Sequence, residues 1–277
     1  SERKAELACL NGDALEAVKI IQSMIDSHHI KEDADIGWYL QHMARYKYTY
    51  SKAESNKEQI QSHKKNRFML KPKTGMQVDL LKISQKRMEK IIAWIKQFEN
   101  YEELSIVLEE ILSRLEFGVK ADSFEKAFDD LGGALGFATE RPDKQWKEGP
   151  DNLWCVNDGE YLLVECKNEV ALDRADINKH ECGQINTAIA WFEKHYPGVK
   201  SRRIMIIPTH KQGPAVAFSC EVEIMRKKEL AGLKYNVRAF FKEFASCEFK
   251  DLSEKTVQKL INEHKLSVES LFSRFIG

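Results

Sequence analysis

Residues 149–167 read GPDNLWCVNDGEYLLVECK, and this stretch decides what kind of fold the chain adopts. Two apolar runs, 152–156 and 161–166, flank the turn-forming sequence Asn157-Asp158-Gly159, a pattern typical of antiparallel strands joined by a tight turn. Alternate side chains of a strand share a face. The second strand would therefore have one apolar face, with Leu162, Val164 and Cys166, and one face that ends in charge, with Tyr161, Leu163, Glu165 and Lys167.

A carboxylate and a lysine would emerge together at the end of this otherwise apolar strand. Such charges are costly to desolvate unless they are paired or coordinate something. Asp151 opens the first strand, so the hairpin would bring it next to Glu165. Two carboxylates beside a backbone carbonyl suit Mg²⁺ or Mn²⁺, and Lys167 could orient or deprotonate water there. These are the parts that phosphodiester hydrolysis requires; the structural alternative is a Glu165–Lys167 salt bridge.

These residues resemble the PD-(D/E)xK nucleases, the restriction-endonuclease-like superfamily. Pro150-Asp151 matches the first half of the family's motif, and Glu165-Cys166-Lys167 matches the second half at a spacing that suits a hairpin. The helix expected over 124–135 looks like the family's first core helix. The later helix, 179–196, looks like its second core helix. Three further positions then match the family's polar site residues: Glu125, Lys179 and Gln184.

The resemblance covers roughly residues 123–208 and implies an α/β fold, an αβββαβ core whose mixed sheet is flanked by helices. It implies a Mg²⁺-dependent phosphodiesterase, with Mn²⁺ as a substitute, whose expected substrate is DNA, with RNA as the alternative; endo- and exonuclease action both stay open. The implied catalytic residues are Asp151, Glu165, Lys167, Glu125 and Gln184. The implied metal ligands are Asp151, Glu165, the Cys166 carbonyl and Glu125. The alternative is a catalytically idle module of the same fold that docks nucleic acid or a partner.

The motif triplet by itself is not specific. Glu-x-Lys also occurs at Glu2-Lys4, Glu248-Lys250 and Glu263-Lys265. A second Pro-Asp, at Pro142-Asp143, lies in a polar stretch that is not followed at once by a strand pattern. The site at Glu165 is singled out because it ends an apolar strand and follows both a Pro-Asp and a core-helix glutamate.

The remainder of the chain is expected to be mostly helical. Helical spacing runs through 4–29, with a break at Asn11-Gly12-Asp13, and through 36–70, before a linker at 71–75. Two further helices are predicted over 78–98 and 102–117. We therefore expect a helical module over 1–120, and a nuclease-like domain with a C-terminal helical extension over 121–277.

The net charge is zero, with 43 basic and 43 acidic residues, but the charges are unevenly distributed. Residues 57–90 are strongly basic and 101–130 strongly acidic. The two blocks could pair as neighbouring helices, or the basic block could meet phosphates. The candidate nucleic-acid ligands are Lys64, Lys65, Arg67, Lys71, Lys73 and Lys179. The tyrosines before the block could stack on bases or pack between helices, namely Tyr46, Tyr48 and Tyr50.

Composition excludes several classes of protein. Hydrophobic residues make up 43% and charged residues 31%, which is typical of a globular protein, and no apolar run approaches the ~18 residues of a membrane span. Six scattered cysteines without a C-x-x-C pair favour a reducing cytoplasm over a disulfide framework. The sequence contains no phosphate-binding loop, so the chain is not expected to be an ATPase itself. The helical module could instead join the nuclease to a helicase or other motor, as a partner or a fused domain. A start at Ser1 suggests a longer parent protein, in DNA processing or defence; a dimer is possible.

Overall fold

The computed structural model describes residues 1–27, 30–72 and 78–275. The chain forms two compact units, Ser1–Asp79 with Lys144–Glu148, and Leu80–Asp143 with Gly149–Gly277. The division therefore falls at residue 79 and not near residue 120, where the change in sequence character had suggested it. The physical reason is tertiary packing, because helices α5 (Arg87–Ile95) and α6 (Tyr101–Arg114) pack with α7 (Ala121–Ala134), the first helix after residue 120.

The first unit consists of helices that pack in sequence: α1 (Glu2–Leu10), α2 (Ala14–Asp26), α3 (Asp33–Lys47) and α4 (Lys52–Lys65). Asp13 caps α2 by accepting a hydrogen bond from the Glu16 amide, so the predicted break is confirmed. The prediction of a single helix over 36–70 is wrong, because two helices, α3 and α4, occupy this region. The chain is not helical between α3 and α4, and Ser51 caps α4. A serine side chain satisfies a free amide at a helix start, which favours a new helix there.

In the described residues, the second unit holds one mixed sheet whose strands lie in chain order. The strands are β1 (Ala138–Glu140), β2 (Asn152–Asn157), β3 (Glu160–Cys166), β4 (Lys200–Ile206) and β5 (Glu223–Met225). β2 pairs with both β1 and β3 in antiparallel fashion, whereas β4 runs parallel to β3 and β5 runs parallel to β4. The hairpin predicted from residues 149–167 is thereby confirmed, with Trp154 opposite Leu162.

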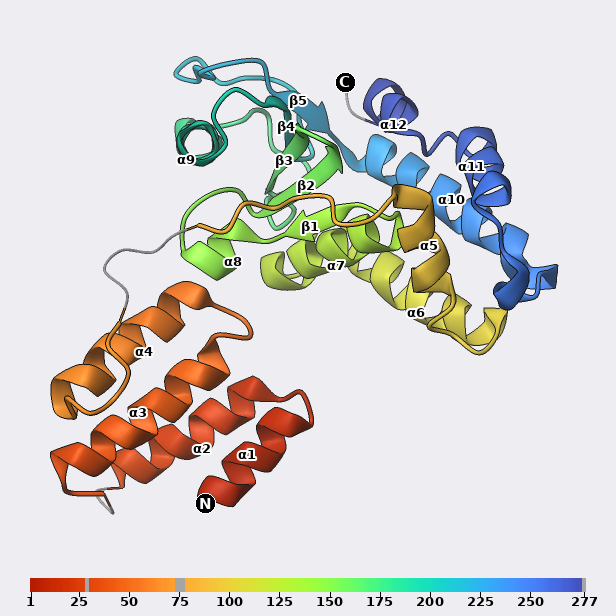
Figure 1. The fold of residues 1–277 in the computed structure, drawn as a ribbon. Coiled ribbons are helices and arrows are strands. Elements are labelled where there is room, and N and C mark those ends of the chain that lie inside the picture. Colours follow the sequence, from red (N-terminus) through yellow and green to blue (C-terminus); the bar gives the residue numbers. More distant parts are fainter. Residues whose placement is uncertain (28–29, 73–77, 276–277) are drawn as a thin grey trace. The chain divides into compact units, whose positions relative to one another are not determined.

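Helices cover both faces of this sheet (Figure 1). The apolar face of β3 packs in the main core with α7 (Ala121–Ala134) and α10 (Lys227–Lys242). On the other face, Tyr161 of β3 makes an edge contact with Phe192 of α9 (Lys179–His195), with ring centroids 5.4 Å apart. α7 approaches the sheet closely at Gly132, where an added Cβ would lie 2.5 Å from the Trp154 ring. The expected α/β class and the two-faced strand are confirmed.

The remaining helices of this unit pack around the core or connect its elements: α5 (Arg87–Ile95), α6 (Tyr101–Arg114), η1 (Glu243–Ser246), η2 (Phe249–Asp251), α11 (Glu254–Glu263) and α12 (Val268–Phe275). The short helix α8 (Pro142–Trp146) is divided between the two units, since Lys144–Glu148 belongs to the first. α5 starts nine residues later than predicted, at Arg87 and not at residue 78. In the segment before it, the Leu81 amide donates to the Tyr196 hydroxyl, and the Leu81 carbonyl accepts from the Tyr161 hydroxyl. These bonds replace helical ones. No helix in the described part of the chain is long and apolar enough to cross a membrane.

Candidate active site

The charged residues of the hairpin meet where β2 begins and β3 ends. Asp151 directly precedes β2, and its Oδ2 accepts a hydrogen bond of 2.7 Å from the Cys166 amide. The hairpin therefore places Asp151 beside the end of the strand that carries Glu165. The approach depends on Gly149, which has a φ of +97° and lies against α9; an added Cβ would be 2.8 Å from the Trp191 ring.

Glu165 and Lys167 form an ion pair at the end of β3. Lys167 Nζ donates to Glu165 Oε1 over 2.8 Å, and the two side chains are 14% and 7% exposed, respectively. The salt bridge considered as the structural alternative is thus present. It accounts for these two residues but leaves the partial burial of Asp151 beside them without explanation, because one ammonium group cannot neutralise two carboxylates.

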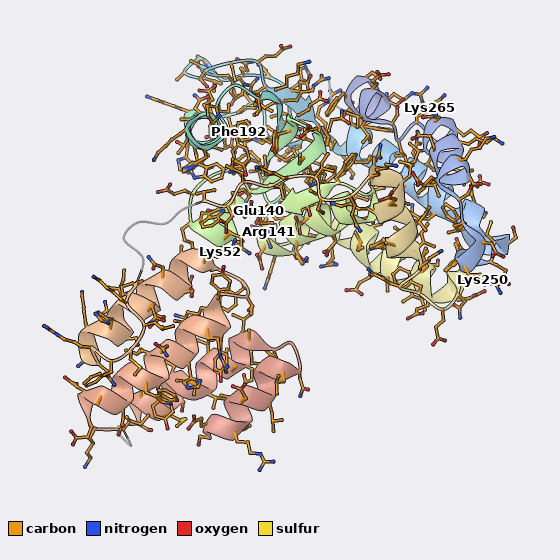
Figure 2. All side chains as sticks on the ribbon, in the orientation of Figure 1. Lys52, Glu140, Arg141, Phe192, Lys250 and Lys265 are labelled. Atoms are coloured by element: carbon orange, nitrogen blue, oxygen red, sulfur yellow. The ribbon has the colours of Figure 1, made fainter. Side chains whose placement is uncertain are left out.

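Helix α7 adds a third carboxylate. Glu125 is buried, and its Oε2 lies 2.5 Å from Nη2 of Arg141, the residue directly after β1. Arg141 lies with Glu140 at the end of β1 (Figure 2). The same Nη2 donates to Asp122 Oδ1 over 2.9 Å. Sequence reasoning missed Arg141, since a lone arginine after a three-residue strand carries no recognisable pattern.

Two buried asparagines join α7 to the hairpin, and sequence reasoning missed them as well. Asn152 and Asn168 are both 0% exposed, and each directly follows a residue of the candidate site. The Asn152 side chain donates to the Glu125 carbonyl over 2.9 Å, and the Asn168 side chain donates to the Val119 carbonyl just before α7. They therefore hold the helix that carries Glu125 against both strands. An amide side chain next to a buried charged residue was the available signal.

The electrostatics show that the carboxylates are under-neutralised. Burial, followed by the charges of Glu165 and Glu125, raises the pKa of Asp151 to about 8. Burial also raises the pKa of Glu165, although Lys167 opposes this. For Lys167, burial acts to lower the pKa, but the Glu165 and Asp151 carboxylates outweigh it and raise the pKa above its usual value. Lys167 is therefore protonated at neutral pH.

The donor set suits a hard divalent cation. Each carboxylate commits one oxygen to a protein donor, and the other takes part in no hydrogen bond of the described residues: Asp151 Oδ1, Glu165 Oε2 and Glu125 Oε1. Carboxylate oxygens are the ligands that Mg²⁺ and Mn²⁺ prefer, and two added positive charges would relieve the repulsion that raises the pKa of Asp151. Nevertheless, residues 1–27, 30–72 and 78–275 contain no group of three His, Cys, Asp or Glu side chains already arranged around an ion position.

The two candidates on α9 are not drawn into this cluster. Lys179 and Gln184 are exposed, and the Gln184 side chain takes part in no hydrogen bond among the described residues. The first turn of α9 is instead organised by a capping box between Asn178 and Glu181. Glu181 is buried and also pairs with Arg174.

The candidate nucleic-acid ligands, apart from Lys179, lie in the first unit and beside it in the chain. Lys64, Arg67 and Lys71 are exposed, whereas Lys65 pairs with Asp33 over 2.8 Å. Lys73 lies outside the described residues. The tyrosines divide between the two alternatives: Tyr46 is buried in the core and donates to Glu6, Tyr48 is 58% exposed, and Tyr50 is partly buried.

The acidic block finds its partners within the second unit. Glu109 forms a two-pronged pair with Arg238 of α10, with its Oε2 2.7 Å from Nη2, and Glu116 pairs with Lys234 over 3.2 Å. The acids near the start of α7 pair with Arg141. These partners lie outside residues 57–90, so for these acids the pairing of the two blocks, one of the two alternatives, does not hold.

No protein-family model, no curated protein and no solved structure matches the chain.

Proposed function

We propose that the second unit is a metal-dependent nuclease of the PD-(D/E)xK type, which hydrolyses phosphodiester bonds. The observation that carries the proposal is the convergence of Asp151, Glu165, Lys167 and Glu125 from β2, β3 and α7 at one end of the sheet. The element order α7, β1, β2, β3, α9, β4, with the short helix α8 inserted between β1 and β2, supports it, because apart from α8 this is the αβββαβ order that the sequence resemblance implies. The preference for DNA over RNA rests on the resemblance.

Each residue has a distinct task in this proposal. Asp151, Glu165, the Cys166 carbonyl and Glu125 would hold Mg²⁺ or Mn²⁺. The cation, when bound, lowers the pKa of water and stabilises negative charge on phosphate oxygens. Since the neighbouring carboxylates keep Lys167 protonated, we assign it to orienting the water and donating to the phosphate, and not to deprotonation. Asn152 and Asn168 hold α7 in place and so keep Glu125 beside the other two carboxylates.

The exposed cations of α4 and the residues that follow it are proposed to bind the nucleic-acid backbone. Lysine and arginine contacts to phosphates release counterions, so binding weakens as salt rises. Replacing Lys64 and Arg67 together by glutamate should weaken oligonucleotide binding and flatten its salt dependence, measured by fluorescence anisotropy. Lys65→Glu is the matched comparison, because Lys65 is already paired with Asp33. If the affinity of the double variant depends on salt as steeply as that of the parent, Lys64 and Arg67 belong to an ordinary solvated surface and do not bind phosphates.

The test of the catalytic proposal is cleavage of single- and double-stranded DNA and RNA in Mg²⁺, Mn²⁺ or chelator. Metal-dependent cutting by the parent should disappear in Asp151→Asn. Glu160→Gln is the matched control, because Glu160 begins β3, at the opposite end of that strand from Glu165, and accepts a hydrogen bond from the Asn157 side chain. Failure to cut any substrate, together with Mn²⁺ binding that is the same in the parent and in Asp151→Asn, would contradict the proposal and favour the idle docking module.

A further inference from the structure

Arg141 has an unusual position for a residue between two elements, because its guanidinium group is held by Glu125, one of the site carboxylates, and by Asp122. The side chain is 12% exposed, and its partner Glu125 is 11% exposed. Nη2 serves both Glu125 and Asp122, while Nε is buried and has no hydrogen-bond partner in the described part of the chain. A buried donor without an acceptor is unfavourable. The guanidinium group is therefore incompletely satisfied where it stands.

The charge of Arg141 conflicts with the proposed cation site. Glu125 is one of the three carboxylates offered to the ion, and the guanidinium group already neutralises it. A divalent cation that takes up Glu125 would repel a permanently charged group at hydrogen-bonding distance. Among the described residues, Arg141 would then keep the exposed Asp122 as its anionic partner, and its unpaired Nε could donate to a further anion. Its planar fork of donors matches the oxygens of a phosphate diester better than a point charge does.

We propose that Arg141 exchanges partners, from Glu125 in the empty site to a phosphate of the substrate once a cation occupies the carboxylates. This inference rests on the proposed nuclease function and deepens it. It names Arg141 as the residue that binds the substrate's phosphate, and it couples substrate binding to occupation of the cation site. It also gives a reason why the three carboxylates are not already arranged around an ion position: one of them is tied to a guanidinium group.

The exchange predicts opposite effects on two affinities, which a purely structural ion pair does not. The first measurement is Mn²⁺ binding to the full chain without substrate, by isothermal titration calorimetry. Arg141→Gln should bind Mn²⁺ about tenfold more tightly than the parent, because a unit charge beside Glu125 has been removed. The second is anisotropy of a labelled oligodeoxynucleotide at saturating Mn²⁺, in a Lys167→Ala background that prevents cutting. There Arg141→Gln should bind about tenfold more weakly, as expected when one charge-assisted phosphate contact is lost.

Two further variants make the outcome decisive. Arg141→Lys keeps the charge but loses the fork, so its Mn²⁺ affinity should match the parent while its oligonucleotide affinity falls; it also serves if Arg141→Gln does not fold. Arg202→Gln removes another ion-paired arginine of the sheet, next to Glu223, and should change neither affinity. If the parent binds Mn²⁺ and Asp151→Asn does not, yet Arg141→Gln gains no affinity, the exchange is overturned while the proposed function stands. If the parent binds no Mn²⁺, both proposals fall.

Discussion

Replacing Asp151 by asparagine should stabilise the metal-free protein at neutral pH. Burial and the neighbouring carboxylates raise the pKa of Asp151 from its usual 3.8 to about 8. At pH 7 the folded state therefore tends to hold a proton that the unfolded chain has released. Asparagine has nearly the same shape, carries no charge, and its side-chain oxygen can still accept the 2.7 Å hydrogen bond from the Cys166 amide. The same change removes a proposed metal ligand.

The sign and size of this stability change follow from the linkage between proton binding and folding. A raised pKa contributes stability that is fully present below pH 3.8 and is lost as the pH rises through about 8. One pKa unit corresponds to ~1.4 kcal/mol and pH 7 lies roughly three units above the unfolded value, so the upper limit is ~4 kcal/mol. Because Glu165 and Lys167 share the proton and the charge with Asp151, we expect a gain of about 1–2 kcal/mol at pH 7 for the variant, shrinking to nearly zero at pH 4.

The assay is urea unfolding in chelator at several pH values between 4 and 8, for the parent, Asp151→Asn and the control Glu160→Gln. The difference between the parent and Asp151→Asn should grow with pH, while Glu160→Gln follows the parent. Adding Mn²⁺ should then stabilise the parent and not the variant, since a ligand stabilises only the state that binds it. A parent and variant whose stabilities stay parallel across the whole range would refute the reasoning.

Three other changes test separate parts of the structure. Lys167→Ala should lower kcat at least ~100-fold, because the group acts on charge developing at the phosphate, and should also lower the melting temperature, because the buried Glu165 loses its ion-pair partner; an unaffected kcat would remove Lys167 from the site. Asn168→Ala should destabilise the protein by about 1–3 kcal/mol, measured by urea unfolding, since a buried carbonyl loses its donor, and wild-type stability would show that water replaces the amide. Gly132→Ala should lower the free energy of unfolding by about 1–3 kcal/mol through its clash with Trp154. Gly133→Ala should raise it by ~0.5–1 kcal/mol, because nothing lies within 4 Å of the added Cβ. Equal effects of the two substitutions on the melting temperature would contradict this packing.

The parts of the site that sequence could predict are the local ones. The hairpin follows from alternation and a turn signal within residues 149–167, and it alone brings Asp151 beside the end of β3. Glu125 was named through a family resemblance, and its approach depends on how α7 packs on the sheet. Arg141 could not be predicted from the sequence, because β1 before it is only three residues long and leaves no clear pattern. The importance of Arg141 lies in its contact with Glu125 of α7.

The parts of the fold that sequence missed have similar causes. Apolar periodicity predicted where α5 and α6 form but not which unit they join, since that depends on contacts with α7. The prediction of one helix over 36–70 did not take account of a local signal, the side chain of Ser51, which caps α4. The late start of α5 depends on two tyrosine hydroxyls more than 70 residues away that bind the Leu81 backbone, and no local pattern reveals such partners.

The order of the strands has a consequence for how the protein behaves at high concentration. The two outermost strands, β1 and β5, are three residues each, whereas the longer β2, β3 and β4 have neighbours on both sides. An exposed long strand offers a row of free amides and carbonyls on which another chain can add. Here each border of the sheet offers only a short row, so strand-to-strand growth into aggregates has little to start from. Engineering that extends β1 or β5 would remove this protection.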